Sequence, residues 1–285
     1  MAILKKSSNK RMFLLSKEKK LLLTQPVVMG ILNATPDSFY GKSRVQSVQQ
    51  AVDAAGAMFD AGAAIVDIGG QSTRPGSERV SFAEELDRVS PVVRAVRQAF
   101  PEAWLSVDTY YSSVALACIG LGIDMINDIA AGDDDPKMFK TVIDNEIAYV
   151  AMHKKGNPST MQEDPHYDDL MGEILGYFHE KKAEYRKKEF ANWVIDPGFG
   201  FGKTTEHNFE LLNQLQKFRQ FNKPLMVGIS RKGMIWKTLN GSPETALNGT
   251  TALHMAALDR GATILRVHDV KEAKECIDLY LALKA

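Results

Sequence analysis

The chain has 285 residues, of which 45% are hydrophobic and 25% are charged, so it has enough apolar material for a large globular core. Its 35 Lys and Arg residues balance 35 Asp and Glu residues. Because the net charge is +0, no overall field attracts nucleic acid or an anionic membrane, and we expect neither as a partner.

The first 20 residues, MAILKKSSNKRMFLLSKEKK, are basic, and lysines interrupt every apolar run. The segment therefore fits neither the apolar core of a signal peptide nor a transmembrane span. It predicts a disordered or frayed extension over residues 1–20, followed by a single domain over residues 21–285.

From residue 27 onward, short apolar runs rich in Val and Ile alternate with longer helical patterns. The runs are too short for helices and predict strands over 27–33, 63–69, 105–109, 125–129, 148–153, 193–197, 225–230 and 263–269. Residues 47–60 carry apolar side chains at helical spacing, and residues 154–188 predict a long loop plus one helix. Ser242-Pro243-Glu244 predicts a helix start, with the helix running to Arg260 and ending at Gly261.

About eight strand–helix repeats in a chain of this length predict an α/β fold closed into a (β/α)₈ TIM barrel. An open doubly wound sheet is the alternative. It needs a glycine-rich turn after the first strand, and Asn33-Ala34-Thr35-Pro36 lacks one.

Polar side chains end nearly every predicted strand. They are Asn33, Asp67, Asp108, Asn127, Asp128, His153, Asp196, Ser230, Arg266 and His268. In a (β/α)₈ barrel the functional groups lie where the strands end, so these side chains predict one site at one end of the barrel.

The two cysteines, Cys118 and Cys276, lie far apart in sequence and form no CxxC motif. They predict buried free thiols and a reducing, cytoplasmic location.

Several cofactors are excluded by spacing. The stretch GFGFGKT (198–204) resembles a phosphate-binding loop, but the P-loop pattern needs glycine where Pro197 stands. The dinucleotide pattern GxGxxG fails because position 203 is lysine. No HExxH motif or Cys/His cluster indicates zinc.

At the predicted strand ends, the chain resembles the dihydropteroate synthase family. The motifs are MGILNATPDSF (29–39), DIGGQSTRPG (67–76), SVDT (106–109), NDIAAG (127–132), IDPGFGFGK (195–203), GISRKGMI (228–235), GTTALH (249–254) and RVHDV (266–270). The resemblance covers essentially the whole chain from about residue 27 onward. It implies a pterin-binding (β/α)₈ barrel.

The resemblance also implies a transfer reaction of folate biosynthesis. In this reaction, p-aminobenzoate is joined to 6-hydroxymethyl-7,8-dihydropterin diphosphate, giving 7,8-dihydropteroate and diphosphate. The family implies Mg²⁺ as cofactor and a cytoplasmic homodimer. Sulfonamides, as mimics of p-aminobenzoate, are expected to compete with it.

Residue roles follow from the same resemblance. The residues implied to bind the pterin and its diphosphate are Thr73, Asp108, Asn127, Met152, Asp196, Lys232, Arg266 and His268. Asp196 suits the pterin edge, because a carboxylate accepts two parallel N–H bonds. Arg266 suits a position flat against the ring and beside phosphate. Asn33 is the implied Mg²⁺ ligand, since Mg²⁺ prefers oxygen and keeps several waters.

The implied p-aminobenzoate site consists of Thr73, Arg74, Pro75, Phe201 and Ser230. The implied catalytic residues are Lys232, Arg266, His268, Asp37 and Arg74, with Asp37 and Arg74 on loops expected to close over the substrates.

Two positions depart from the family. Gln71 stands where glutamate is commoner, and the stretch YGKSR after Phe39 lacks an aspartate–diglycine sequence. Both concern loops.

Two other functions remain as alternatives. A pterin-barrel methyltransferase handling methyltetrahydrofolate would keep the pterin-edge Asp and Asn but has no reason for STRPG or SRKG. A non-catalytic pterin-binding paralogue predicts losses at the diphosphate or loop positions, yet Asn33, Arg74, Arg266 and His268 are all present.

Overall fold

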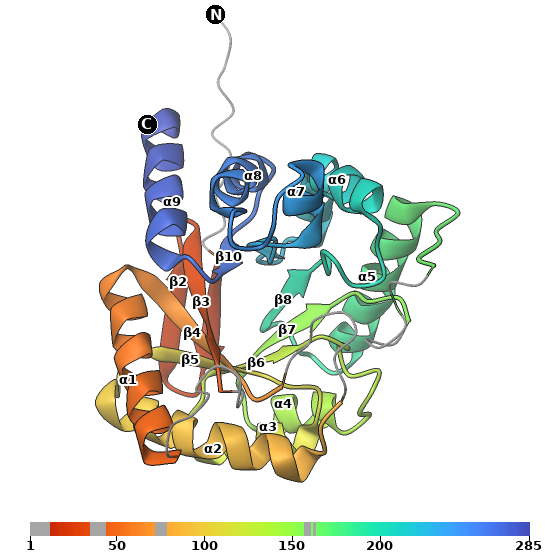
Figure 1. Ribbon diagram of the computed structural model, residues 1–285. Helices are drawn as coiled ribbons and strands as arrows, with labels where there is room; N and C mark the ends of the chain where they lie inside the picture. Colours follow the sequence, from red (N-terminus) through yellow and green to blue (C-terminus); the bar gives the residue numbers. More distant parts are fainter. Residues whose placement is uncertain (1–11, 35–43, 72–78, 157–160, 162–163) are drawn as a thin grey trace, which may run out of the picture.

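The computed structural model describes residues 12–34, 44–71, 79–156, 161 and 164–285. Within them, parallel strands alternate with helices around a central sheet (Figure 1). The strands of this sheet are β3 (Val27–Asn33), β4 (Ala63–Gly69), β5 (Trp104–Asp108), β6 (Met125–Asp128), β7 (Ala148–Met152), β8 (Trp193–Asp196), β9 (Met226–Val227) and β10 (Ile264–Val267).

The sheet closes on itself. Its order is β8-β7-β6-β5-β4-β3-β10-β9, with parallel pairing at every step. A parallel bridge between Ile195 and Leu225 joins the two ends, and the Ile195 N–H donates to the Pro224 carbonyl at 2.9 Å. The (β/α)₈ barrel is confirmed. The open doubly wound alternative is wrong, because the bridge joins the two ends of the sheet and an open sheet has two unpaired edge strands.

The predicted strands are all found, and β3 and β4 have the predicted bounds. β9 is much shorter than predicted. Beyond Val227 the backbone leaves the ladder and reaches a left-handed turn at Arg231, where φ is 54°. That departure brings Ser230 and Lys232 to the carboxyl end of the barrel.

Helices cover the outside of the barrel. They are α1 (Arg44–Asp60), α2 (Phe82–Ala99), α3 (Ser112–Gly120), α4 (Met138–Asp144), α5 (Leu170–Lys187), α6 (Thr205–Asn213), α7 (Gly233–Thr238), α8 (Leu247–Asp259) and α9 (Val270–Lys284), with a 3₁₀ helix at Leu215–Phe221. No helix among the described residues is long and apolar enough to cross a bilayer.

The predicted helix start at Ser242 is wrong, because α8 begins at Leu247. Residues 242–245 form a turn instead, in which the Thr245 N–H donates to the Ser242 carbonyl at 3.1 Å. The carbonyls of Pro243 and Glu244 accept hydrogen bonds from Arg231 at 2.8 and 3.0 Å, so they are withdrawn from a helical ladder. The predicted stop is confirmed, since Gly261 follows the helix with φ +105°.

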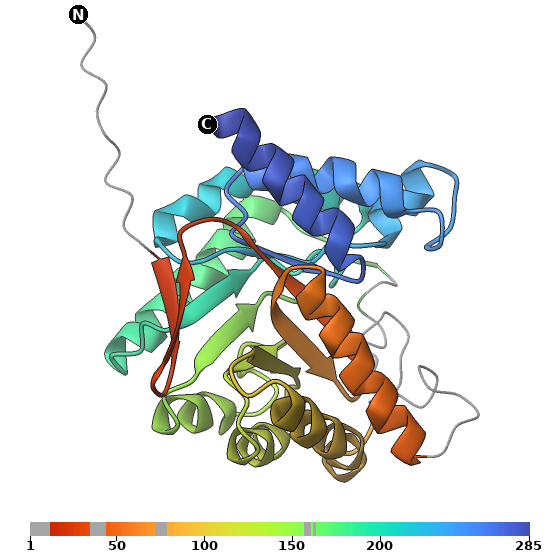
Figure 2. The same ribbon diagram turned by 90° about the vertical axis from the view of Figure 1, so that its left-hand side faces the viewer.

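A β-hairpin precedes the barrel, formed by β1 (Met12–Ser16) and β2 (Lys19–Leu23) (Figure 2). The predicted frayed extension is therefore wrong for residues 12–20, while residues 1–11 lie outside the described residues. The hairpin lies at the amino end of the barrel strands. There Asn192, just before β8, exchanges hydrogen bonds with the backbone of Leu15 at 2.9 and 2.7 Å. Lys19 reaches the carbonyls of Pro101 and Ala103, just before β5.

The hairpin covers an apolar floor inside the barrel. Leu14 is 1% exposed and packs in a cluster with inward-facing strand residues. These are Met29, Ile65, Trp104, Met125, Ala148, Val150, Val194, Met226 and Ile264. Alternate positions of the hairpin thus find a buried face for Leu14, Leu21 and Leu23, while Leu15 and Leu22 face outward.

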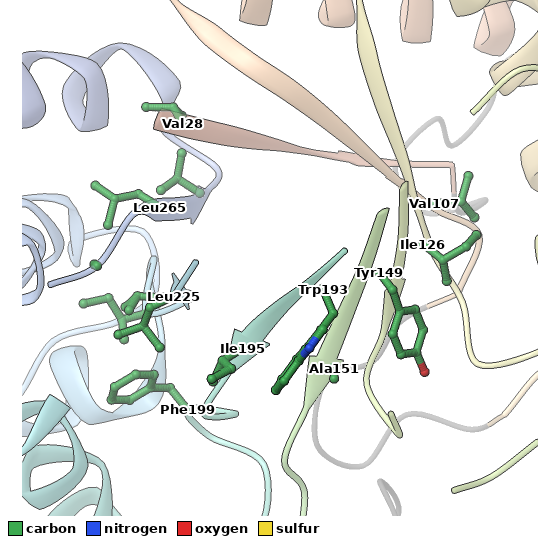
Figure 3. Close-up of a cluster of buried hydrophobic side chains, with 14 of the residues drawn as sticks. Val28, Val107, Ile126, Tyr149, Ala151, Trp193, Ile195, Phe199, Leu225 and Leu265 are labelled. Carbon is green, nitrogen blue, oxygen red and sulfur yellow. The ribbon is translucent and has the colours of Figure 1, made fainter. Parts of the chain in front are cut away.

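The opposite face of each strand packs against the helices. Figure 3 shows part of this outer cluster, including Val28, Val107, Ile126, Tyr149, Trp193 and Leu265. Strands buried on both faces explain the continuous apolar runs in the sequence. Cys118 and Cys276 are buried free thiols, as predicted.

Candidate active site

Side-chain alternation places the polar residues of the strand ends inside the barrel. On each strand, the residue two or four positions after a floor residue faces the same way. Asp67 follows the floor residue Ile65, Asn127 follows Met125, and Arg266 follows Ile264. Because all strands are parallel, these residues meet at one end, here called the mouth, where Asn33, Asp67, Asp108, Asn127, Met152, Asp196 and Arg266 lie.

The centre of the mouth is a buried ionic cluster. Arg266 Nε donates to Asp67 Oδ2 at 2.7 Å, and Arg266 Nη2 donates to Asp108 Oδ2 at 2.6 Å. Asn127 Nδ2 also donates to Asp67 Oδ2, at 2.8 Å. Asp67 has 0% exposure. Four strands are thereby linked, and the guanidinium is held between two carboxylates.

These carboxylates keep unused acceptors. Within the described part of the chain, the buried atoms Asp67 Oδ1, Asp108 Oδ1 and Ser106 Oγ have no hydrogen-bond partner. Each such group costs about 1–3 kcal/mol when left unpaired. Burial raises the pKa of Asp108 to about 7, since desolvation and the nearby Asp67 outweigh the attraction of Arg266. The mouth therefore favours a ligand that brings N–H donors.

A second part of the mouth is the turn over 197–203, which follows β8. The Gly198 N–H donates to Asp196 Oδ1 at 2.8 Å and orients that carboxylate. Lys232 Nζ donates to the carbonyl of Phe199 and lies 4.8 Å from the centroid of the Phe201 ring. Burial raises the pKa of Asp196, and the charge of Lys232 opposes that rise. Burial lowers the pKa of Lys232 to about 8, against the attraction of Asp196.

The loops after β9 and β10 are tied together. Ser230 Oγ lies 3.2 Å from His268 Nδ1 and accepts a hydrogen bond from the His268 N–H, also at 3.2 Å. Between Ser230 and Lys232, Arg231 points the other way and makes a two-pronged ion pair with Asp269, both contacts being 2.8 Å. The left-handed backbone of Arg231 is thus fixed by its own side chain.

An apolar wall completes the mouth. Met152, which is 2% exposed, forms a small cluster with Tyr110, Ile129 and Ala130, and Phe201 packs against it. A flat aromatic ligand can lie against such a surface while its edge meets the carboxylates.

The structure brings most of the predicted site residues together. The described ones at the mouth are Asn33, Asp108, Asn127, Met152, Asp196, Phe201, Ser230, Lys232, Arg266 and His268. Asn33 ends β3 opposite Gly69, and its Oδ1 is 3.9 Å from the place where a Cβ on that glycine would lie. Asp37, Thr73, Arg74 and Pro75 lie outside the described residues. Gln71, just before that loop, donates to buried Glu85 at 2.6 Å and accepts from Tyr110 at 3.0 Å.

The sequence pattern placed Asp67 among the polar residues at strand ends but gave it no role. Its position two residues after buried Ile65 was the signal that it faces inward, toward Arg266. It also gave no role to Lys203, which it treated only as part of a failed nucleotide motif. No local pattern shows that this lysine is 2% exposed.

The barrel and its mouth define an enzyme of the (β/α)₈ class with a site for a flat heterocycle that bonds through its edge. Residues 29–268 match the family model for pterin binding enzymes. The chain is 45% identical to the dihydropteroate synthase of Escherichia coli K12, over 93% of this chain and 94% of that protein.

Solved structures agree. The structure of Yersinia pestis dihydropteroate synthase with a sulfonamide drug complex superposes with a TM-score of 0.89 at 41% identity, covering 96% of this chain and 99% of that one. The Xanthomonas albilineans enzyme with 4-aminobenzoic acid gives 0.88 at 35% identity, with the same coverage. The chain belongs to the dihydropteroate synthase family, transferases that condense a pterin with p-aminobenzoate in folate biosynthesis.

Proposed function

We propose that the mouth of this barrel binds 6-hydroxymethyl-7,8-dihydropterin diphosphate and transfers its pterin-methyl group to p-aminobenzoate, releasing 7,8-dihydropteroate and diphosphate. One observation carries the proposal. The buried cluster of Asp67, Arg266, Asp108 and Asn127 leaves carboxylate oxygens unpaired at the one end of the barrel where cationic and apolar side chains also gather.

The pterin edge carries adjacent N–H donors, and the proposed readers supply matching acceptors. Asp196 accepts two of these donors in parallel, while Asp108 accepts another through its unpaired Oδ1. Asn127 has both a donor and an acceptor on its amide, and Asp67 fixes its orientation. Met152 lies under the ring.

The other face and the tail of the pterin meet the cations. Arg266 is planar and already held flat between two carboxylates, so it stacks on the ring and contacts phosphate. Lys232 donates to the pterin carbonyl or a ring nitrogen in place of its present contact with the carbonyl of Phe199. His268, held by Ser230, lies beside the diphosphate.

The donor set at the mouth fits Mg²⁺. Asn33 offers an amide oxygen, a hard ligand of the kind that Mg²⁺ prefers. No group of three or more His, Cys, Asp or Glu side chains among the described residues forms a cage of its own. Asn33 would therefore hold the ion together with diphosphate oxygens and water. The bound ion would neutralise charge on the departing diphosphate.

The reaction breaks the C–O bond between the pterin methylene and the diphosphate, and the electron pair leaves with the diphosphate. The amine nitrogen of p-aminobenzoate forms the new C–N bond and then loses a proton to water. Arg266 and His268 stabilise the departing negative charge. Asp37 and Arg74 are also proposed to take part, and both lie outside the described residues.

The p-aminobenzoate pocket adjoins Lys232. Ser230 donates to the carboxylate and Phe201 contacts the ring. The proposed pocket also includes Thr73, Arg74 and Pro75, which lie outside the described residues. The Xanthomonas albilineans structure with 4-aminobenzoic acid and the Yersinia pestis structure with a sulfonamide support this assignment and competition by sulfonamides. We further propose one domain, which includes the hairpin from Met12 and so begins before the predicted residue 21. We also propose a homodimer and a cytoplasmic location, the last being consistent with two buried free thiols.

The test is to incubate the chain with the pterin diphosphate, p-aminobenzoate and Mg²⁺ and to measure diphosphate and dihydropteroate. Both products are expected in equal amounts. Asp196→Ala and Lys232→Ala are expected to weaken binding of the pterin diphosphate at least tenfold. Near-normal binding in both variants would remove the site assignment. Inhibition by sulfonamides that is non-competitive toward p-aminobenzoate would refute the second pocket.

A further inference from the structure

A buried lysine beside the mouth has no part in the chemistry above. Lys203 is the last residue of the turn over 197–203 and is 2% exposed. Its Nζ donates to the carbonyls of Gly198 at 2.9 Å and Phe201 at 3.2 Å, and it lies 3.1 Å from His153 Nδ1. An ammonium group has three N–H donors, so these three acceptors match it one for one.

The turn that Lys203 holds is rich in glycine and has one backbone hydrogen bond of its own between described residues, from the Phe201 N–H to the Gly198 carbonyl at 3.2 Å. Gly198, Gly200 and Gly202 have φ of +72°, +78° and +63°, in the left-handed region that favours glycine. The turn is also pressed against the segment after β7. A Cβ on Gly198 would lie 1.9 Å from the carbonyl oxygen of His153, and one on Gly202 would lie 2.2 Å from that of Lys155. Glycine loses the most backbone freedom on folding, so the turn depends on groups that fix it.

Those groups are two side chains. From α6, Asn208 Oδ1 accepts from the Gly200 N–H at 2.7 Å. Within the turn, Lys203 binds the carbonyls of Gly198 and Phe201. Two further backbone groups of the turn bind residues of the mouth: the Gly198 N–H orients Asp196, and the Phe199 carbonyl accepts from Lys232.

We propose that Lys203 is a positioning residue for pterin binding, because its ammonium group holds the turn that aims Asp196 and sets Phe201 beside Lys232. This inference rests on the function proposed above, in which Asp196 and Lys232 contact the pterin. Lys203 itself touches no substrate.

The charges around the turn agree with this role. Asp196 is faced by Lys203, by Lys232 after β9, by Arg266 on β10 and by Asp108 on β5. The three cations lower the pKa of Asp196 against the rise that burial causes. The pKa of His153 is lowered to about 2 by burial and by Lys203 and Lys155, so the ring is neutral, and its tautomer with the proton on Nε2 accepts from the ammonium group through Nδ1. Burial lowers the pKa of Lys203 to about 7, and the charge of Asp196 opposes that fall.

The test compares Lys203→Met with Lys181→Met. Lys181 is a matched control, since it is 8% exposed and donates to the Ala131 carbonyl at 3.0 Å and to Asp133 at 2.6 Å. It lines a hollow beside α5 and not the mouth. The probe is 6-hydroxymethylpterin, which lacks the diphosphate, titrated by calorimetry from pH 5 to pH 9.

Lys203→Met is expected to lose about tenfold in pterin affinity at pH 6, where Lys203 in the parent chain carries its proton, while Lys181→Met stays within about twofold of the parent chain. The acid limb of the binding profile is also expected to move to higher pH in Lys203→Met, because Asp196 loses a nearby cation. A residue that only supported the fold would not move that limb. An affinity within twofold of the parent and an unmoved acid limb would overturn the proposal.

If Lys203→Met fails to fold, His153→Phe serves instead. It keeps an aromatic ring beside Tyr167 and Tyr177 but removes the third acceptor of Lys203. A loss of about threefold or more in pterin affinity is expected, and an unchanged affinity would overturn the proposal. If the parent chain binds no pterin, both the proposed function and this role fall. If the parent and Lys181→Met bind and Lys203→Met binds equally well, only the role of Lys203 falls.

Discussion

Replacing Asp67 by asparagine tests the ionic cluster at the mouth. The change keeps the shape of the side chain but removes the charge that holds Arg266 Nε at 2.7 Å and Asn127 Nδ2 at 2.8 Å. Arg266 keeps Asp108 as its other partner at 2.6 Å. A hydrogen bond to a charged group contributes about 1.5–3 kcal/mol net. At 1.4 kcal/mol per factor of ten, pterin affinity should therefore fall by roughly 10- to 100-fold.

The assay is calorimetric titration with 6-hydroxymethylpterin, and Asp124→Asn is the control. Asp124 is also a buried carboxylate paired with an arginine, Arg97, at 2.5 Å, but it precedes β6 at the amino end of the barrel. The control should lose stability and keep its pterin affinity. Equal affinities in Asp67→Asn and the parent chain would refute the reasoning that Asp67 orients Arg266 and Asn127 for the ligand.

Three further predictions follow from the same structure. Burial raises the pKa of Asp108 from 3.8 to about 7. Between these two pH values the folded chain keeps a proton that the unfolded chain has released. The free energy of unfolding should therefore fall by on the order of a few kcal/mol as the pH rises from about 4 to about 7. Asp108→Asn should flatten the dependence of urea unfolding on pH between 4 and 7, and an unchanged slope would count against it. Arg231→Leu removes the ion pair between the Ser230 loop and Asp269, which follows His268. Inhibition by pyrophosphate should therefore weaken severalfold more than binding of 6-hydroxymethylpterin. Equal losses for both ligands would contradict the placement of the diphosphate beside His268. Leu14→Ala should cost about 2–5 kcal/mol of unfolding free energy without changing pterin affinity, and an unaltered urea midpoint would show that the hairpin does not seal the barrel floor.

The barrel could be predicted because its strands are buried on both faces. β3 and β4 read as unbroken apolar runs bounded by polar residues, and their predicted bounds match the structure. The helix before β10 was placed too early because Ser242-Pro243-Glu244 has good capping chemistry. The competing partner, Arg231, comes from a loop that no local pattern connects with it.

The hairpin was missed for a similar reason. Leu14 looks like part of an interrupted basic tail until the barrel floor that it covers is present. Burial against residues remote in sequence decided the outcome, and tertiary packing of this kind overrides local composition.

In the site, too, some features could be predicted from the sequence and others depend on tertiary contacts. Strand-end residues such as Asp108, Asp196 and Arg266 could be placed at one mouth from parallel topology alone. The pairing of Arg266 with Asp67, and the burial of Lys203 under a glycine turn, depend on side-chain positions that spacing does not encode.

The most direct test is a crystal structure of the chain with 6-hydroxymethylpterin diphosphate and Mg²⁺. The ring should lie between Met152 and Arg266, with its N–H edge on Asp108 and Asp196 and its diphosphate toward His268 and Asn33. A pterin bound with its edge away from these carboxylates, or seated in the hollow beside α5, would contradict the account.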